Sequence, residues 1–281
     1  MGSLQVYPST SALPSLSPIS TTETRVTRKQ VLAALRTQRI PVPDLIPLFS
    51  HWPSKVSPEL DKLRKDVDTW LNTFSLPSKA LDAFRSSDFG HFGATWWPYA
   101  SDFTRLRIVT YVAIWLFIWD DEIDNATGSM WEDWESAQKF RLDTIQYVEY
   151  CLGLAPEDQK DPEPRSSIIR GFEVIGVTIR DSCSLTQRKM VFDEMKEFMK
   201  QSEQEQHIRL NNDRLPSVAE FWNYRLGASA VFICLAINEY AYGDMELPVE
   251  IFGDADMKEI WQLTNIIISA SGSFLLASST G

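Results

Sequence analysis

Apolar residues recur at three- and four-residue intervals through most of this 281-residue sequence, and sustained two-residue alternation, the mark of a half-buried strand, is absent. Residues at that spacing share one face of an α-helix. Prolines, glycines and the polar stretch 155–164 interrupt the pattern. The sequence therefore predicts an all-α fold of helices joined by short loops. The predicted helices are Val26–Leu35, Leu60–Phe74, Leu106–Trp119, Trp131–Leu152, Ser167–Ile179 and Leu185–Met199.

The beginning of the sequence differs in composition from the rest. Residues 1–25 are rich in Ser, Thr and Pro and lack the continuous apolar stretch of a secretory signal. We expect a disordered leader over 1–25, followed by one helical domain over 26–281. Cys151, Cys183 and Cys234 are far apart in the sequence, which favours reduced thiols and a cytoplasmic location over a disulfide framework.

Charge and hydropathy exclude two classes of partner. The net charge of −11 argues against nucleic acid, because phosphate backbones are bound by clustered Lys and Arg. The strongest internal apolar run, Ile108–Trp119, is shorter than the about 20 residues of a membrane span and predicts a buried helix. A tail anchor over the uncharged segment Leu263–Gly281 is the alternative, but Ser, Thr, Gly and Asn dilute it, so no integral membrane segment is expected.

The apolar run is followed by acids. Asp120, Asp121, Glu122 and Asp124 occupy four of five consecutive positions where the helix dipole is negative and like charges repel. A divalent cation would compensate this charge, since Asp120 and Asp124 are four residues apart and share a helix face.

The acids also permit other interpretations. A solvated helix end needs no ligand at all. An EF-hand calcium loop fits poorly, because neither Asp120 nor Asp121 as first ligand places both the turn glycine and the final glutamate correctly. Zinc is not indicated, because the three histidines have no ligand spacing.

A second segment contains an arginine that needs a partner. Ser217 and Glu220 form a predicted capping box, and the helix that begins there should extend to about Tyr240. Arg225 lies inside this helix among aromatic and aliphatic neighbours. A guanidinium in such surroundings requires an anionic partner or a route to water.

Taken together, Trp96–Asp124 and Phe221–Ser229 resemble class I terpene synthases, most closely the fungal sesquiterpene cyclases, over roughly residues 30–270. The resemblance implies a class I terpenoid synthase helical bundle. It implies that Asp120, Asp121 and Asp124 bind Mg²⁺, and that Asp120 and Arg225 are catalytic. It further implies that Arg225 and Ser229 contact the substrate diphosphate, with Arg225 as its sensor, and that a helix break at Ala228 and Ser229 supplies a linker and an effector carbonyl.

The activity implied by the resemblance is that of a lyase of secondary metabolism. It would ionise and cyclise farnesyl diphosphate with release of diphosphate, although geranyl and geranylgeranyl chains stay open. Mg²⁺ and an arginine neutralise the leaving group, and aromatic faces stabilise the carbocation. The candidate wall residues, each of which could equally be core packing, are Trp115, Phe117, Trp119, Trp222 and Tyr224.

The sequence departs from the family at its second metal motif. We expect an Asn or Asp, a Ser or Thr three residues later and an acid four further on, beginning near Ser271; residues 268–281 hold no such set. The family's C-terminal helices and Arg-Tyr pair are also missing. The bundle is therefore expected to be incomplete at the C-terminus, through an altered transcript or gene model, and poorly stable and nearly inactive. The Asn and Asp residues that have Ser or Thr three positions later but no final acid are Asp66, Asn72, Asp124, Asp133 and Asp181.

Two other functions stay open on the sequence. A truncated, inactive terpene synthase-like protein would keep Asp120 and Arg225 without turnover. A prenyl-chain-elongating synthase would share the fold and the acidic helix end, but it would need a second aspartate-rich motif, and none is visible.

Overall fold

A computed structural model describes residues 30, 33, 34, 38, 44, 46–160, 162–211, 215–243 and 247–279 of the chain. The chain divides into two units, Met1–Gln38 and Arg39–Gly281. The expected leader over 1–25 and most of the predicted helix Val26–Leu35 lie outside the described residues, so the domain boundary at residue 26 stays a prediction.

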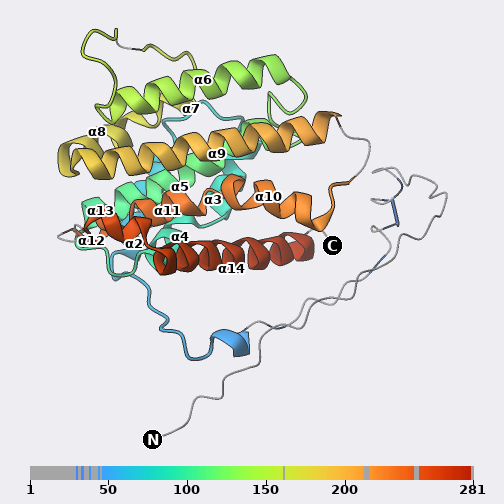
Figure 1. Cartoon of the computed structure of the whole chain (residues 1–281), viewed down its shortest axis with the longest axis horizontal. Helices are drawn as coiled ribbons and strands as arrows, with labels where there is room; N and C mark the ends of the chain where they lie inside the picture. Colours follow the sequence, from blue (N-terminus) through green and yellow to red (C-terminus); the bar gives the residue numbers. More distant parts are fainter. Residues whose placement is uncertain are drawn as a thin grey trace, which may run out of the picture. The chain divides into compact units, whose positions relative to one another are not determined.

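Every regular element of the described residues in the second unit is a helix, which confirms the all-α prediction (Figure 1). No helix of the described residues is long and apolar enough to cross a membrane. The helices are η1 (Ile46–Phe49), α2 (Leu60–Leu71), α3 (Ser78–Ser86), α4 (Phe89–Trp96), α5 (Phe103–Asp124), α6 (Trp134–Cys151), α7 (Ser167–Arg170), α8 (Glu173–Ser182), α9 (Leu185–Asn211), α10 (Val218–Ala228), α11 (Val231–Ala236), α12 (Asn238–Tyr242), α13 (Val249–Gly253) and α14 (Ala255–Ser279).

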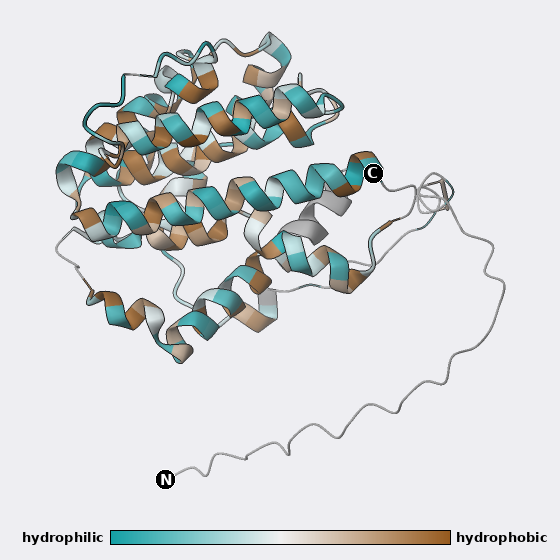
Figure 2. Cartoon of the chain, turned by 45° about the horizontal axis from the view of Figure 1, so that its top comes forward, coloured by the Kyte–Doolittle hydropathy of each residue, from teal (hydrophilic) through white to brown (hydrophobic). Residues whose placement is uncertain are grey.

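Helix α5 is the centre of this unit. It packs against α2, α4, α7, α8, α9, α11 and α12, and it is apolar on nearly every face, as a helix surrounded by others must be. Trp115 and Trp119 are fully buried on it, and their indole nitrogens donate to the Ile168 carbonyl oxygen at 2.7 Å and to Thr144 Oγ1 at 2.9 Å. The outer helices combine hydrophilic and hydrophobic faces (Figure 2).

Several predicted boundaries differ from the structure. The predicted helix Ser167–Ile179 is divided into α7 and α8 around Gly171, where a Cβ atom would come within 2.4 Å of the Phe74 ring. Helix α9 continues to Asn211, twelve residues beyond the predicted end at Met199. The polar sequence of that extension hid it, because it lacks apolar periodicity.

The segment after Ser217 is helical but interrupted. The capping box between Ser217 and Glu220 is confirmed, with both of its hydrogen bonds present. The continuous helix to Tyr240 is wrong, because α10 ends at Ala228 and Ala230 adopts the left-handed conformation with φ 58° before α11 begins. That conformation is uncommon for a residue other than glycine and stops the helix.

Candidate active site

The acidic residues occupy the last turns of α5. Asp121 is exposed, whereas Asp120 and Asp124 are only partly accessible. Burial raises the pKa of Asp120 well above its usual range, and repulsion from Asp124 and Glu205 raises it further, while the positive charge of Arg225 opposes the shift. The carboxylates are therefore crowded together with too little positive charge around them.

Helix α9 brings a further carboxylate, Glu205, and a guanidinium group, Arg209, to this end of α5. Burial and the nearby Asp124 raise the pKa of Glu205, against the charges of Arg225 and Arg209. Arg209 Nη2 lies 3.5 Å from Asp124 Oδ1 in an ion pair whose arginine side chain is only 10% exposed. Neither residue was predicted from the sequence.

Arg225 reaches the same cluster from α10. Helices α5 and α10 both pack against α9, and the Arg225 charge acts on the pKa of both Asp120 and Glu205. The Arg225 Nε atom is buried and has no hydrogen-bond acceptor in the described part of the chain. A buried, unsatisfied cationic donor beside the carboxylates is suited to an anionic ligand.

The donor set consists of carboxylate oxygens, which are the ligands that Mg²⁺ prefers. Among the described residues, no three His, Cys, Asp or Glu side chains are gathered so as to hold a metal ion by themselves. Mg²⁺ does not require such a cage, since it keeps several waters and is usually bound through one or two carboxylates together with substrate phosphates. Four carboxylates against the guanidinium groups of Arg141, Arg209 and Arg225 leave net negative charge here, so the residues fit a cation whose coordination the substrate completes.

The break between α10 and α11 is fixed from α14. Asn265 is fully buried, donates to the Leu226 carbonyl oxygen at 2.6 Å and accepts from Ser229 Oγ at 2.8 Å. Ser269, one turn later on α14, donates to the same Asn265 oxygen at 2.9 Å. The predicted diphosphate contact Ser229 is thus hydrogen-bonded within the protein, and Ala228 before it is buried.

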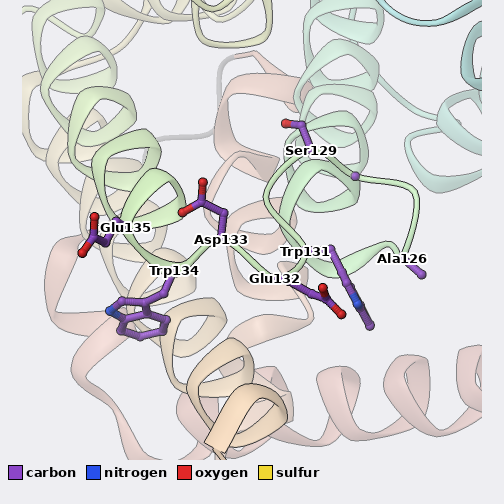
Figure 3. Close-up of a pocket in the computed structure, with 8 residues that line it drawn as sticks. Ala126, Ser129, Trp131, Glu132, Asp133, Trp134 and Glu135 are labelled. Carbon is purple, nitrogen blue, oxygen red and sulfur yellow. The ribbon is translucent and has the colours of Figure 1, made fainter.

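The loop after α5 folds back over the acidic helix end. Met130 N donates to the Glu122 carbonyl oxygen at 2.9 Å, and a Cβ atom on Gly128 would lie 2.2 Å from the Asp121 carbonyl oxygen. A broad open hollow of about 790 Å³ borders this loop, but neither Asp120 nor Asp124 lines it (Figure 3). Its lining residues are Ala126, Gly128, Ser129, Trp131, Glu132, Asp133, Trp134 and Glu135.

The predicted wall residues fall into two groups. Trp115 and Trp119 belong to the hydrophobic core, where Trp119 stacks with Phe140 at 5.5 Å between ring centroids. Phe117 is 46% exposed and has ring contacts with Phe89 and Phe92. On α10, Tyr224 is buried and Trp222 is partly exposed.

Four site residues were missed by the sequence analysis: Glu205, Arg209, Asn265 and Ser269. The first two lie in the polar end of α9, where no pattern separates them from solvated neighbours. Asn265 and Ser269 are four residues apart, so a search at three-residue spacing passed over them. Their four-residue spacing, which places two residues on one helix face, is the signal that identifies them.

The described helices form a helical domain in which acids and arginines are gathered at one helix end, a donor set suited to a cation and an anion. Residues 111–271 match the model of terpene synthase family 2, C-terminal metal binding. The sesquiterpene cyclase hepA of Aspergillus oryzae is 32% identical over 254 residues, covering 88% of this chain and 68% of that protein. The terpene cyclase braA of Annulohypoxylon truncatum is 27% identical over 226 residues, covering 80% of this chain and 59% of that protein.

A solved structure has the same fold. The a-eudesmol synthase structure superposes with a TM-score of 0.64 at 16% identity, covering 83% of this chain and 70% of that one. The chain therefore belongs to the class I terpene synthase family, as the resemblance implied. It spans about three fifths to two thirds of the length of the two curated relatives.

Proposed function

We propose that this chain is a Mg²⁺-dependent sesquiterpene synthase that ionises and cyclises farnesyl diphosphate and releases inorganic diphosphate. The observation that carries the proposal is the cluster of Asp120, Asp124 and Glu205 with Arg209 and Arg225, contributed by α5, α9 and α10. Ionisation of a prenyl diphosphate requires neutralisation of its leaving group, and this cluster combines cation ligands with a cationic hydrogen-bond donor.

Asp120, Asp121 and Asp124 would hold the metal, whose positive charge when bound stabilises the departing diphosphate. Arg225 would donate from its guanidinium to diphosphate oxygens, which gives its buried Nε an acceptor. The side chains of Asp120 and Arg225 thus bind opposite charges at one place. This arrangement also keeps the diphosphate oriented while its bond to carbon breaks.

The apolar part of the substrate needs an aromatic surface next to the carboxylates. Phe117 lies three residues before Asp120 and shares its side of α5, and it contacts Phe89 and Phe92 with centroid distances of 5.2 and 6.1 Å. Ring faces in such a group stabilise a carbocation and exclude water from it. We assign the wall to these three residues, with Trp115 and Trp119 as supporting core.

The choice of farnesyl diphosphate follows from the name of hepA as a sesquiterpene cyclase, since a sesquiterpene skeleton contains the carbon atoms of one farnesyl chain. The cytoplasm is the proposed compartment. Cys151 and Cys234 are buried and form no disulfide among the described residues, as suits a reducing compartment.

Turnover is expected to be slow. Asn265 and Ser269 offer oxygen ligands of the kinds used by the family's second metal motif, but residue 273, four positions further, is Ser rather than an acid. A weaker second site provides less charge to stabilise the leaving diphosphate.

The test is incubation of the purified chain with farnesyl diphosphate and Mg²⁺, with gas chromatography of extracted products and measurement of released diphosphate. A cyclic sesquiterpene that disappears on addition of EDTA is expected, with geranyl and geranylgeranyl diphosphates as comparison substrates. Diphosphate release no faster than that of the Asp120→Asn variant would contradict the proposal.

A further inference from the structure

Arg209 is held by contacts in four directions at the end of α5. Its Nη1 donates to the Trp131 carbonyl oxygen at 2.6 Å, and its Nη2 donates to the Ile123 carbonyl oxygen at 2.8 Å. The guanidinium carbon lies 3.5 Å from the centroid of the Trp131 ring, and Nη2 pairs with Asp124. A side chain fixed in this way has one orientation, and it fixes its partners in return.

These partners are the acidic helix end and the loop that follows it. The Ile123 carbonyl belongs to the last turn of α5, where carbonyl groups have no partner within the helix. Trp131 lies at the far end of the loop, so one guanidinium joins both ends of the segment that contains Asp124.

A second hydrogen bond from α9 holds the same loop. Gln206 is fully buried, and its Nε2 donates to the Met130 carbonyl oxygen at 2.9 Å. Its Oε1 accepts from Arg141 Nη1 of α6 at 2.8 Å. The loop is therefore held to α9 at two adjacent residues, Met130 and Trp131.

We propose that Arg209 is a positioning residue of the metal and diphosphate site, which holds Asp124 and the end of α5 in the arrangement that binds the cation. The inference rests on the proposed function, since it concerns the same site. Arg209 acts through Asp124 and the backbone of Ile123, and no contact with substrate is assigned to it.

A counter-charge role and a positioning role predict opposite changes in cation affinity when Arg209 is removed. If Arg209 were only a counter-charge, its removal would make the carboxylate cluster more negative, and a divalent cation would bind more tightly. If it positions Asp124, its removal weakens cation binding, because residues that orient metal ligands are worth about 10- to 100-fold in affinity. The sign of the change separates the two roles.

The experiment measures Mn²⁺ binding to the full chain by loss of the free-ion electron paramagnetic resonance signal, with and without inorganic diphosphate. Arg209→Gln is expected to weaken binding about 10- to 100-fold. Arg209→Lys keeps the charge but lacks the planar fork that reaches two carbonyl groups and stacks on an indole, so it also weakens binding.

Arg188→Gln is the matched control. Arg188 lies at the other end of α9, and its Nη1 donates to the carbonyl oxygens of Leu152 and Gly153 at 2.7 and 3.2 Å. It is 21 residues from Arg209, or about 30 Å along a helix. Its loss removes the same kind of arginine-to-carbonyl bonds, so the control variant should lower the melting temperature and leave Mn²⁺ affinity unchanged.

Each result is decisive. The positioning role would be wrong if the wild-type chain binds Mn²⁺, Arg209→Gln binds it equally or more tightly, and Arg209→Lys binds it as the wild type does. The proposed function would then still stand. If Arg209→Gln does not melt cooperatively, Arg209→Lys decides the question. Absence of Mn²⁺ binding by the wild-type chain, with or without diphosphate, would overturn the proposed function and this inference together.

Discussion

Ser229 and Asn265 are joined by a 2.8 Å hydrogen bond between α14 and the residue that follows α10. Replacing Asn265 with Leu keeps the volume but removes three hydrogen bonds, one to the Leu226 carbonyl and one from each of the Ser229 and Ser269 hydroxyls. Each hydrogen bond contributes about 0.5–1.5 kcal/mol net, so the free energy of unfolding should fall by at least about 1 kcal/mol. Urea denaturation checks this. Thr264→Val on the same helix removes only a bond from a half-buried hydroxyl to Ile260 and should have a much smaller effect.

Asp120→Asn should lower Mg²⁺-dependent diphosphate release at least 100-fold. The amide keeps the shape of the side chain but removes the charge of a metal ligand, at a cost of several kcal/mol in the transition state. Asp143→Asn on α6 is the control, because the ion pair of Asp143 among the described residues is with the exposed Lys139 at 2.8 Å. Equal rates for the two variants would rule out Asp120 as a metal ligand.

Ser273→Glu should strengthen cation binding. Residues 265, 269 and 273 are spaced by four in the sequence. A carboxylate at position 273 adds the acid that the second metal motif requires. We expect tighter Mn²⁺ binding in the presence of diphosphate and faster product formation. The charge-neutral Ser273→Gln provides the comparison, and identical behaviour of both variants would show that position 273 does not serve the site.

Gly128→Ala should disturb the acidic helix end. The added Cβ atom would lie 2.2 Å from the Asp121 carbonyl oxygen, so the loop or the helix end has to move. We expect a lower melting temperature and weaker Mn²⁺ binding. Gly253→Ala is a matched substitution, because no atom of the described residues lies within 4 Å of its new Cβ atom, and it should leave both properties unchanged.

Low pH should remove the contribution that the contact between Arg64 and Asp88 makes to stability. The bidentate contact with Arg64 lowers the pKa of Asp88 below its ordinary value of 3.8, and the His91 amide lowers it further. A carboxylate whose folded-state pKa is lowered stabilises the fold above the unfolded-state pKa, and this contribution disappears as pH falls through the folded-state pKa. Asp88→Asn should therefore be less stable than the wild type at pH 7, with a difference that shrinks below about pH 4. Asparagine tolerates the φ of 47° found at this position.

The central helix and its acidic end could be predicted from the sequence, because a run of apolar residues without interruption has to be buried and acids directly after it are unusual. The partners of those acids could not. Arg209 and Ile123 are 86 residues apart, and only the packing of α9 beside α5 brings them together. Local patterns carry no information about such an approach.

The interruption after α10 shows a different limit. Ala and Ser are compatible with a helix, so the composition of residues 217–240 predicts no break. The left-handed Ala230 is stabilised by its surroundings, in which the Asn265 amide binds the Leu226 carbonyl and the Ser229 hydroxyl. The resemblance anticipated the break, whereas helix propensity did not.

Helix α9 has a mechanical consequence for the site. It is one helix of 27 residues, or about 40 Å, that contacts α5, α6, α10 and α11 and carries both Glu205 and Arg209. Since the two side chains are attached to the same helix one turn apart, a movement of that helix carries both of them toward or away from Asp124 together. Any shift of α9 along its axis would change the positions of Glu205 and Arg209 relative to the acidic end of α5, and it would move the contact with the Arg225 helix at the same time.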